Sequence, residues 1–248
     1  MAHKYNGVVR ICLWSSPRNI STALMYSFAQ RADTYAFDEP HYGHYLRVVN
    51  AQHPGEQEVM AAMDCNGDRV TRNVILAPYD RPIVFFKNMT HHLVDLNLDF
   101  LEHTVNILLT RNPVEMLPSL QKGLGRLPIL RDTGFGGQLD LLERLKSLGQ
   151  NPPILESREL LLDPPGVLRQ LCAHIDIPFD EAMLSWPPGP KPEDGVWAKY
   201  WYHNLHKSTG FQPYRPKTEP FPDELRPLLA ECQPVYEQLL PHVIRAGK

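Results

Sequence analysis

A polar loop between an apolar run and a helical pattern is the first place in this sequence where chemistry could occur. Residues 8–14 have the nearly continuous apolar composition of a strand covered on both faces, and a helical pattern follows the loop 15–22. A helix N-terminus presents unpaired N–H groups and about half a positive charge, and Arg18, Ser21 and Thr22 add side-chain donors. The loop therefore predicts a phosphate or sulfate site, with ordinary capping of the helix by Ser21 as the alternative.

Groups that could stabilise charge or move a proton follow two other predicted strands. Lys87 stands near the end of the apolar run 81–89, where an unpaired ammonium is costly to bury. We therefore expect it to face an anion, with a lysine that reaches the surface as the alternative. Glu39 ends the preceding predicted strand, and His91 and His92 follow Lys87, so these three side chains are candidate general bases. Capping of a turn or of a helix start is the alternative for each of them.

The elements that must position these groups alternate between strand and helix over the first 175 residues. With right-handed crossovers, this order predicts an α/β fold in which a parallel sheet is flanked by helices in three layers. Such sheets bind ligands beyond the carboxyl ends of their strands. Segments 43–77 and 123–149 are the expected insertions. The predicted strands are 8–14, 34–40, 81–89, 103–113 and 152–160.

The length and composition of the chain limit its class. Its 248 residues are 43% apolar and 21% charged, which is enough to bury a substantial core. We expect one domain over 1–248, in which 186–248 form a loop-rich cover and a closing helix, because the 24 prolines concentrate after Pro152. The net charge of −3 gives no overall field for nucleic acid or an anionic membrane.

Other features of the sequence bear on location and partners. No apolar run approaches the roughly 20 residues of a membrane span, and the first residues lack the apolar stretch of a signal peptide. We therefore expect a cytoplasmic protein with no nucleic-acid and no membrane partner, and leave a monomer and a homodimer as alternatives.

Several signatures of other enzyme classes are missing from the sequence. The Walker pattern G-x-x-x-x-G-K-[ST] and the serine hydrolase pattern G-x-S-x-G do not occur. His41, His44, His91 and His92 match no metal-ligand spacing, so we expect no metal. We therefore do not expect the anion loop to belong to an ordinary ATP or GTP hydrolase or to a serine hydrolase.

Two motifs in order resemble one family. The string SPRNISTAL resembles the 5′-phosphosulfate loop of sulfotransferases that use 3′-phosphoadenosine 5′-phosphosulfate (PAPS), a variant P-loop. The string LLTRNPVEMLPS is similar to that family's R-[ND]-P motif, in which the arginine and a serine eight residues later hold the 3′-phosphate. The resemblance implies a P-loop-like fold and transfer of the PAPS sulfonate to a hydroxyl or amine of a small-molecule acceptor. The product would be 3′-phosphoadenosine 5′-phosphate, and no metal would be needed.

The resemblance also implies roles for individual residues. Lys87 would contact the transferred sulfonate, and Glu39 would take the acceptor's proton, with His91 as the rival base. The string KSTGF resembles in position the loop that closes over the nucleotide. The implied nucleotide contacts are Ser16, Arg18, Asn19, Ile20, Ser21 and Thr22 around the first loop, Arg111 and Ser119 at the 3′-phosphate, and Lys207, Ser208 and Gly210 in the closing loop.

One residue departs from the pattern of that family. Ile20 stands where the family's loop usually has glycine, which permits unusual dihedral angles and a close approach of the ligand. We therefore expect either an ordinary backbone conformation at Ile20 or a reshaped loop. A protein that binds the nucleotide without transfer, and a phosphotransferase that uses ATP and magnesium, are the alternative functions.

A group of aromatic residues could form the wall of the acceptor pocket or part of the core. Core is the expectation, because the string WAKYWYH has the spacing of a helix that packs on the domain. The residues are Tyr42, Tyr45, Trp197, Tyr200, Trp201 and Tyr202.

Overall fold

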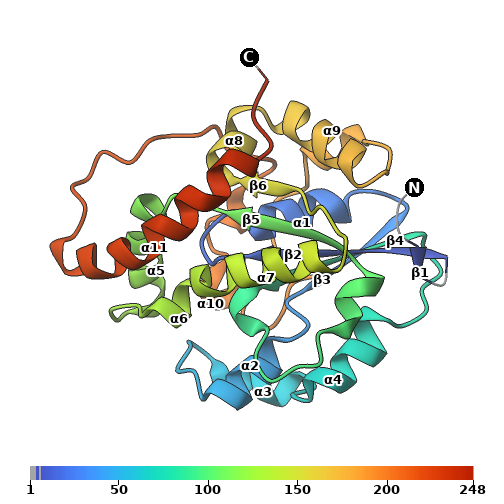
Figure 1. Ribbon diagram of the computed structural model, residues 1–248, viewed down its shortest axis with the longest axis horizontal. Helices are drawn as coiled ribbons and strands as arrows, with labels where there is room; N and C mark the ends of the chain where they lie inside the picture. The colour runs from blue at the N-terminus through green and yellow to red at the C-terminus, as the bar shows by residue number, and fades with distance from the viewer. Residues whose placement is uncertain (1–3, 6, 248) are drawn as a thin grey trace.

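A sheet of six strands forms the middle layer of the structure, a computed structural model that describes residues 4–5 and 7–247 (Figure 1). The strands are β1 (Lys4–Tyr5), β2 (Val8–Ser15), β3 (Thr34–Asp38), β4 (Ile83–Met89), β5 (Val105–Thr110) and β6 (Ile154–Glu156). Five strands run parallel in the order β3-β4-β2-β5-β6, and β1 pairs antiparallel with β2. Residues 1–3, 6 and 248 of the domain predicted over 1–248 lie outside the described residues.

The central strand β2 shows why helices cover both faces of the sheet. All eight of its residues are buried, and successive side chains point to opposite faces. Leu13 packs in one hydrophobic cluster with α1 (Ser21–Ala29) and α9 (Pro164–His174). Trp14 packs in a second cluster with α7 (Phe135–Ser147). Figure 1 shows these helices on the two sides of the sheet, so the predicted three-layer α/β fold is confirmed.

The two expected insertions have different roles in the fold. Residues 123–149 include α7, which covers one face of the sheet, so this segment belongs to the layers of the fold and the expectation of an insertion is wrong for it. Residues 43–77 carry a group of short helices that lie together in Figure 1. They are α2 (Tyr42–Val49), α3 (Glu56–Ala62), α4 (Gly67–Val70) and the π-helical turn Thr71–Ile75.

The predicted fifth strand is too long. The observed strand, β6, ends at Glu156, and α8 (Ser157–Leu162) begins at the next residue. The Glu156 carboxylate accepts hydrogen bonds from the backbone N–H groups of Arg158 and Glu159, at 2.7 and 3.1 Å. It therefore caps the helix, which ends the strand at this position.

The C-terminal part contains little regular structure before its last helix. The string WAKYWYH contributes only the four-residue helix α10 (Ala198–Trp201). Residues 211–222 contain no helix or strand and sweep around the outside of the molecule to α11 (Arg226–Leu239), as Figure 1 shows. None of the helices in the described part of the chain has both the length and the apolar composition of a membrane span.

Other helices connect these elements. Hydrophobic residues of α11 pack against α5, which follows β5. The remaining helices and 3-10 turns are α5 (Pro113–Leu124), α6 (Leu130–Thr133), Thr90–His92, Asp99–His103, Glu181–Leu184, Leu205–Lys207, Asp223–Leu225 and Leu240–His242.

The stacking of Phe28 on Phe85 offers a test of the core. The two rings lie 4.2 Å apart between α1 and β4, and both side chains are fully buried. We expect Phe85→Ala to lower the free energy of unfolding by about 3–5 kcal/mol, because it removes buried apolar surface and leaves a cavity. Leu162→Ala, at a side chain that is 50% exposed, should cost less than about 1 kcal/mol. Urea unfolding measures both, and equal losses would contradict this account of the core.

Candidate active site

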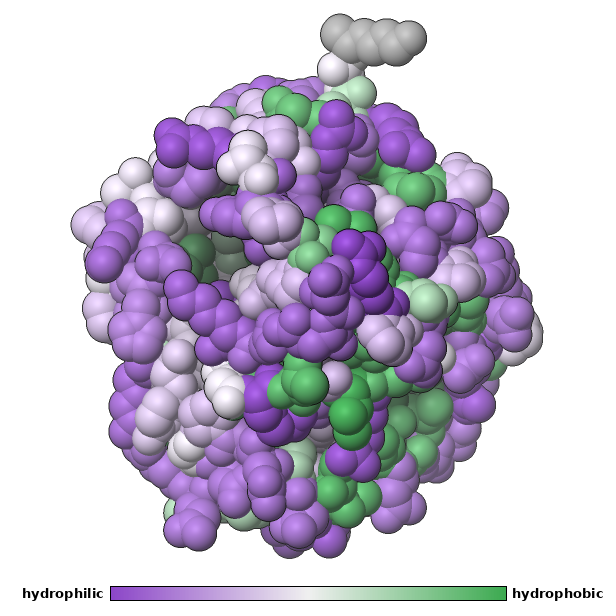
Figure 2. All heavy atoms as spheres, turned by 90° about the vertical axis from the view of Figure 1, so that its left-hand side faces the viewer, coloured by the Kyte–Doolittle hydropathy of each residue, from purple (hydrophilic) through white to green (hydrophobic). Residues whose placement is uncertain are grey.

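A cavity of about 350 Å³ lies beyond the carboxyl ends of the parallel strands. Residues that follow β2, β3, β4 and β5 line it on one side, and residues 197–212 line it on the other. Figure 2 faces the side where α5 and α11 lie and shows a hollow in a largely hydrophilic surface. The predicted site residues that line the cavity are Arg18, Asn19, Ile20, Ser21, Thr22, Glu39, Lys87, His91, Arg111, Ser119, Ser208 and Gly210.

The structure does not bring two of the predicted contact residues to the cavity. Ser16 is fully buried, and its hydroxyl accepts a hydrogen bond from the Asn19 side chain at 3.2 Å. Lys207 is exposed at the end of a 3-10 turn and is not among the lining residues. Ser208 does line the cavity, although its hydroxyl donates to the Leu205 carbonyl oxygen at 2.7 Å.

Asn19 fixes the anion loop to the sheet. Its side-chain amide donates to the Ser16 hydroxyl and, at 3.0 Å, to the carbonyl oxygen of Leu109 on β5. Its side-chain oxygen accepts from the N–H of Ser21 at 3.3 Å, and its carbonyl oxygen accepts from the Ser157 hydroxyl at 2.9 Å. The polar atoms of Asn19 are therefore used to hold the loop in place.

Ile20 adopts a conformation that favours glycine. Its φ is 66° and its ψ is 12°, so the expectation of an ordinary conformation is wrong. The left-handed region costs an L-residue roughly 1–2 kcal/mol, and β-branched residues rarely adopt it. Two contacts hold Ile20 there: its carbonyl oxygen accepts the Leu24 N–H at 3.0 Å, and its side chain packs against the core. The backbone thus takes the dihedral angles that the family's glycine would permit.

Two arginines line the cavity, and a lysine lies near them. Arg18 donates to the Ser119 hydroxyl at 3.1 Å, and Arg111 donates to the Arg18 carbonyl oxygen at 2.7 Å. Arg111 also forms an ion pair with Glu115 at 3.1 Å. Lys217 donates to the Glu115 carbonyl oxygen at 2.9 Å. We call Arg18, Ser119, Arg111 and Lys217 the cation cluster. Its three positive charges face two carboxylates, those of Glu115 and Glu219.

The pKa shifts in the cation cluster are consistent with an unbalanced positive charge. Burial and then the charge of Arg111 lower the pKa of Arg18. Burial and the same neighbour lower the pKa of Lys217. An anion bound among these side chains would therefore be stabilised. The sequence offered no signal for Lys217, because it lies in a proline-rich stretch without a motif.

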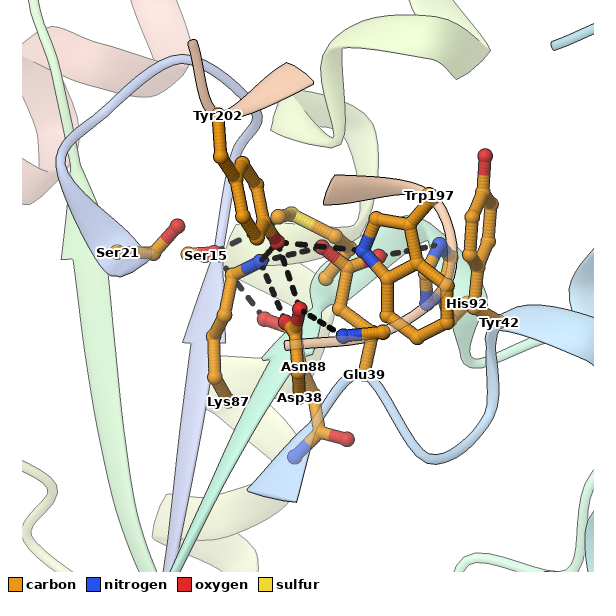
Figure 3. Close-up of polar contacts among 12 residues, drawn as sticks. Ser15, Ser21, Asp38, Glu39, Tyr42, Lys87, Asn88, His92, Trp197 and Tyr202 are labelled. Carbon is orange, nitrogen blue, oxygen red and sulfur yellow. Dashed lines mark hydrogen bonds and ion pairs between the residues drawn. The ribbon is translucent and has the colours of Figure 1, made fainter. Parts of the chain in front are cut away.

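A buried lysine also lines the cavity (Figure 3). The side chain of Lys87 is 1% exposed, which excludes the surface alternative. Its ammonium donates to Asp38 at 2.9 Å, to Glu39 at 2.5 Å and to the Tyr202 hydroxyl at 2.8 Å. Burial alone would lower the pKa of Lys87, but the charges of Asp38 and Glu39 raise it well above its usual value. The ammonium therefore stays charged at neutral pH.

Glu39 is held beside Lys87 by the backbone as well as by its side chain. Its N–H donates to the Lys87 carbonyl oxygen at 2.7 Å, and its φ of 42° turns the chain sharply after β3. Burial raises the pKa of Glu39 to about 7, since it outweighs the opposing effect of Lys87. A carboxyl group with a pKa near neutrality can accept and release a proton in the physiological range.

His92, more than His91, is the histidine close to Glu39. The distance between His92 Nε2 and Glu39 Oε2 is 3.8 Å, whereas the ring of His91 packs against the rings of Tyr45 and His92. Burial lowers the pKa of His91 to about 3 and that of His92 well below its usual value. Both rings are therefore neutral at physiological pH.

The aromatic group is divided between core and cavity. Tyr45 is fully buried away from the cavity lining, and Tyr200 is 39% exposed. The other four residues belong to, or pack against, one buried hydrophobic cluster, as the core interpretation predicted, and they also line the cavity. His53, which the sequence analysis missed, lines the same wall and accepts or donates a 2.9 Å hydrogen bond with the Tyr42 hydroxyl. The four aromatic residues of the wall are Tyr42, Trp197, Trp201 and Tyr202.

In the part of the chain that the structure describes, no group of three or more His, Cys, Asp or Glu side chains is arranged to hold a metal ion.

The comparison with family models gives this fold and site a class. A model of the sulfotransferase domain matches residues 9–242, so the chain belongs to the sulfotransferase domain family. The family resemblance predicted from the two sequence motifs is thus confirmed. Membership supports a transferase and sulfotransfer as the general class of reaction.

Solved sulfotransferase structures share the fold of this chain at low sequence identity. The sulfotransferase domain from the curacin biosynthetic pathway is 18% identical, with a TM-score of 0.53, over 96% of this chain and 99% of that domain. A sulfotransferase from Alicyclobacillus acidocaldarius is 11% identical, with a TM-score of 0.55, over 95% of this chain and 97% of its own.

Two plant proteins are more similar in sequence. Branched-chain-amino-acid aminotransferase-like proteins 1 and 2 of Arabidopsis thaliana are 38% and 37% identical over 231 residues. The match covers 93% of this chain and 41% of each plant protein, so the chain spans less than half of their length. Their names say nothing of sulfotransfer.

The conformation of Ile20 leads to a test of backbone strain. Because Ile20→Ala and Ile20→Gly both remove the side chain, their difference isolates the cost of a positive φ. We expect the glycine variant to be more stable by about 1 kcal/mol in urea unfolding. In the right-handed helix α1, alanine should be more stable than glycine, so Ala23→Gly should lower the free energy of unfolding by about 1 kcal/mol. An alanine variant at position 20 that is as stable as the glycine variant would show that the loop relaxes.

Proposed function

We propose that the protein transfers the sulfonate of PAPS to a hydroxyl or amine of a small-molecule acceptor. The observation that carries the proposal is that the anion loop, Arg18, Arg111 and Ser119 of the cation cluster, and the buried Lys87–Glu39 pair all line one cavity. The two motifs shared with PAPS-dependent enzymes support this choice of nucleotide. The protein would therefore bind a nucleotide with two anionic groups, the 3′-phosphate and the 5′-phosphosulfate, next to a basic carboxylate.

The residues present fit this nucleotide. The cation cluster would hold the 3′-phosphate through Arg18, Arg111 and Ser119. The N–H groups of Thr22 and Ala23 in the first turn of α1, together with the Ser21 and Thr22 hydroxyls, would hold the 5′ side, since the first N–H groups of a helix have no partner within their own helix. Bound PAPS supplies the activated sulfonate for the reaction.

The chain's own groups would do the rest of the chemistry. Glu39 would take the proton of the acceptor, because its pKa is near neutrality and its carboxyl group lines the cavity. Lys87 would stabilise the negative charge on the oxygens around the reacting centre from a site without bulk water. The aromatic wall would hold the acceptor beside Glu39. In this wall, the rings of Tyr42 and Trp197 are in edge contact.

Nucleotide affinity is the first test of the proposal. Calorimetric titration should show that 3′-phosphoadenosine 5′-phosphate binds more tightly than AMP or ATP with magnesium. Arg111→Ala should weaken that binding by about 1.5–3 kcal/mol, or about 10- to 150-fold, because it removes charged hydrogen bonds to a phosphate. Arg226→Ala is the matched control, since Arg226 is exposed and also paired with a nearby carboxylate, Asp223.

Each outcome of this titration has a clear meaning. Equal affinity for AMP would refute the role of the 3′-phosphate, and tighter binding of ATP with magnesium would favour a phosphotransferase. Tight binding of the nucleotide without transfer to any acceptor in a panel of alcohols, phenols and amines would favour a binding protein that does not catalyse.

The pH dependence of transfer tests the choice of base. Because only ionised Glu39 can take a proton, kcat/KM should fall as the pH decreases through about 7. Burial, Lys87 and Asp38 set this value, and His92 lies 3.8 Å from the same carboxyl group. Glu39→Gln should lower the rate about 10²–10⁴-fold. An acid limb near pH 3 that is lost in His91→Asn would assign the base to His91 instead.

A further inference from the structure

The three hydrogen bonds of Lys87 account for the three N–H donors of an ammonium. Two acceptors come from the end of β3 and its following residue, and the third comes from Tyr202, 115 residues further along the chain than Lys87. A ligand oxygen can therefore bond to this ammonium only if one of the three present acceptors gives way. The arrangement of the acceptors indicates which one that is.

Asp38 and Tyr202 are bonded to each other as well as to Lys87. The Tyr202 hydroxyl donates to Asp38 Oδ2 at 2.8 Å, and it accepts from Lys87 and, at 3.2 Å, from Trp197 Nε1. The phenol thus uses its one donor and both of its acceptor positions. Asp38 also accepts from the Gly195 N–H at 3.4 Å. Lys87, Asp38 and Tyr202 form a closed triangle of hydrogen bonds (Figure 3).

The fold fixes this triangle from two directions. Asp38 is the Cα partner of Lys87 in the parallel pairing of β3 and β4, so the sheet itself sets their separation. Tyr202 comes from the segment 197–212, which lines the opposite side of the cavity. Glu39 is outside the triangle: its first oxygen contacts Lys87, and its second is 3.8 Å from His92.

We propose that Asp38 and Tyr202 are positioning residues that hold the Lys87 ammonium by two of its donors, and that its third donor passes from Glu39 to the ligand's anionic group. The same exchange frees the Glu39 carboxylate to face the acceptor. This inference rests on the proposed function, because the anionic group is the one that the nucleotide brings. It makes the placement of Lys87 depend on Tyr202, and hence on the position of the segment 197–212.

The test uses Tyr202→Phe, which removes only the hydroxyl, and Asp38→Asn. Tyr79→Phe is the matched control, because the Tyr79 hydroxyl donates to the Val74 carbonyl oxygen and lies outside the cavity lining. The first readout needs no nucleotide. In protein labelled with nitrogen-15 at the lysine side chains, the Lys87 ammonium should give a resolved signal, because three hydrogen bonds and burial slow its proton exchange with water. Lys87→Met assigns that signal.

We expect the Lys87 signal to persist in the control and to broaden or disappear in Tyr202→Phe and in Asp38→Asn. The second readout separates positioning from binding. Tyr202→Phe should lower kcat by at least about tenfold, with the affinity for 3′-phosphoadenosine 5′-phosphate unchanged within about twofold. The double variant should lose about as much as the more severe single variant, because both residues act through one nitrogen atom.

The results separate this inference from the proposed function. A Lys87 signal and a kcat that are unchanged in Tyr202→Phe would overturn the inference in an active enzyme. If the wild type neither binds the nucleotide nor transfers, the proposed function fails, and the ammonium signal still decides whether Tyr202 and Asp38 hold Lys87. If thermal unfolding shows that Tyr202→Phe does not fold, Asp38→Asn provides the same two readouts.

Discussion

The charge of Lys87 is the constraint on which the rest of the site depends. An ammonium that is 1% exposed loses several kcal/mol of hydration, and only well-placed acceptors can compensate for this loss. Asp38 supplies one acceptor through strand pairing, Glu39 supplies another from a sharp turn, and Tyr202 supplies the third from the C-terminal part. A single buried charge therefore ties the sheet edge to the segment that covers it.

The cavity separates two kinds of electrostatic environment. At the cation cluster, positive charge exceeds negative charge, which suits a phosphate. Around Lys87 the balance is reversed, because two carboxylates surround one ammonium. Burial, and less strongly the charge of Asp38, raise the pKa of Glu39 against the opposing effect of Lys87. Such a layout lets one bound molecule contact both the cations and a proton acceptor.

Backbone strain in the described residues is concentrated at the same place. Six residues other than glycine have a positive φ, and three of them are Asn or Asp, which tolerate that region well: Asn50, Asp95 and Asp176. The other three are Arg18, Ile20 and Glu39, and all of them line the cavity. Strain of this kind persists when surrounding contacts hold it, and it clusters at functional sites. Here the strained residues place the anion loop and the Glu39 carboxyl group at the same cavity.

The sequence by itself determined the features that depend on neighbouring residues: the buried parallel strands, the anion loop before α1, and the R-N-P motif before α5. It also placed Lys87 and Glu39 at strand ends. Only the tertiary structure decided which distant groups meet. Tyr202 and Asp38 are 164 residues apart. The string that carries Tyr202 has helical spacing but forms only the four-residue helix α10, and its spacing does not predict which strand end it meets. The left-handed Ile20 is likewise held by packing and sheet contacts, which local propensity cannot predict.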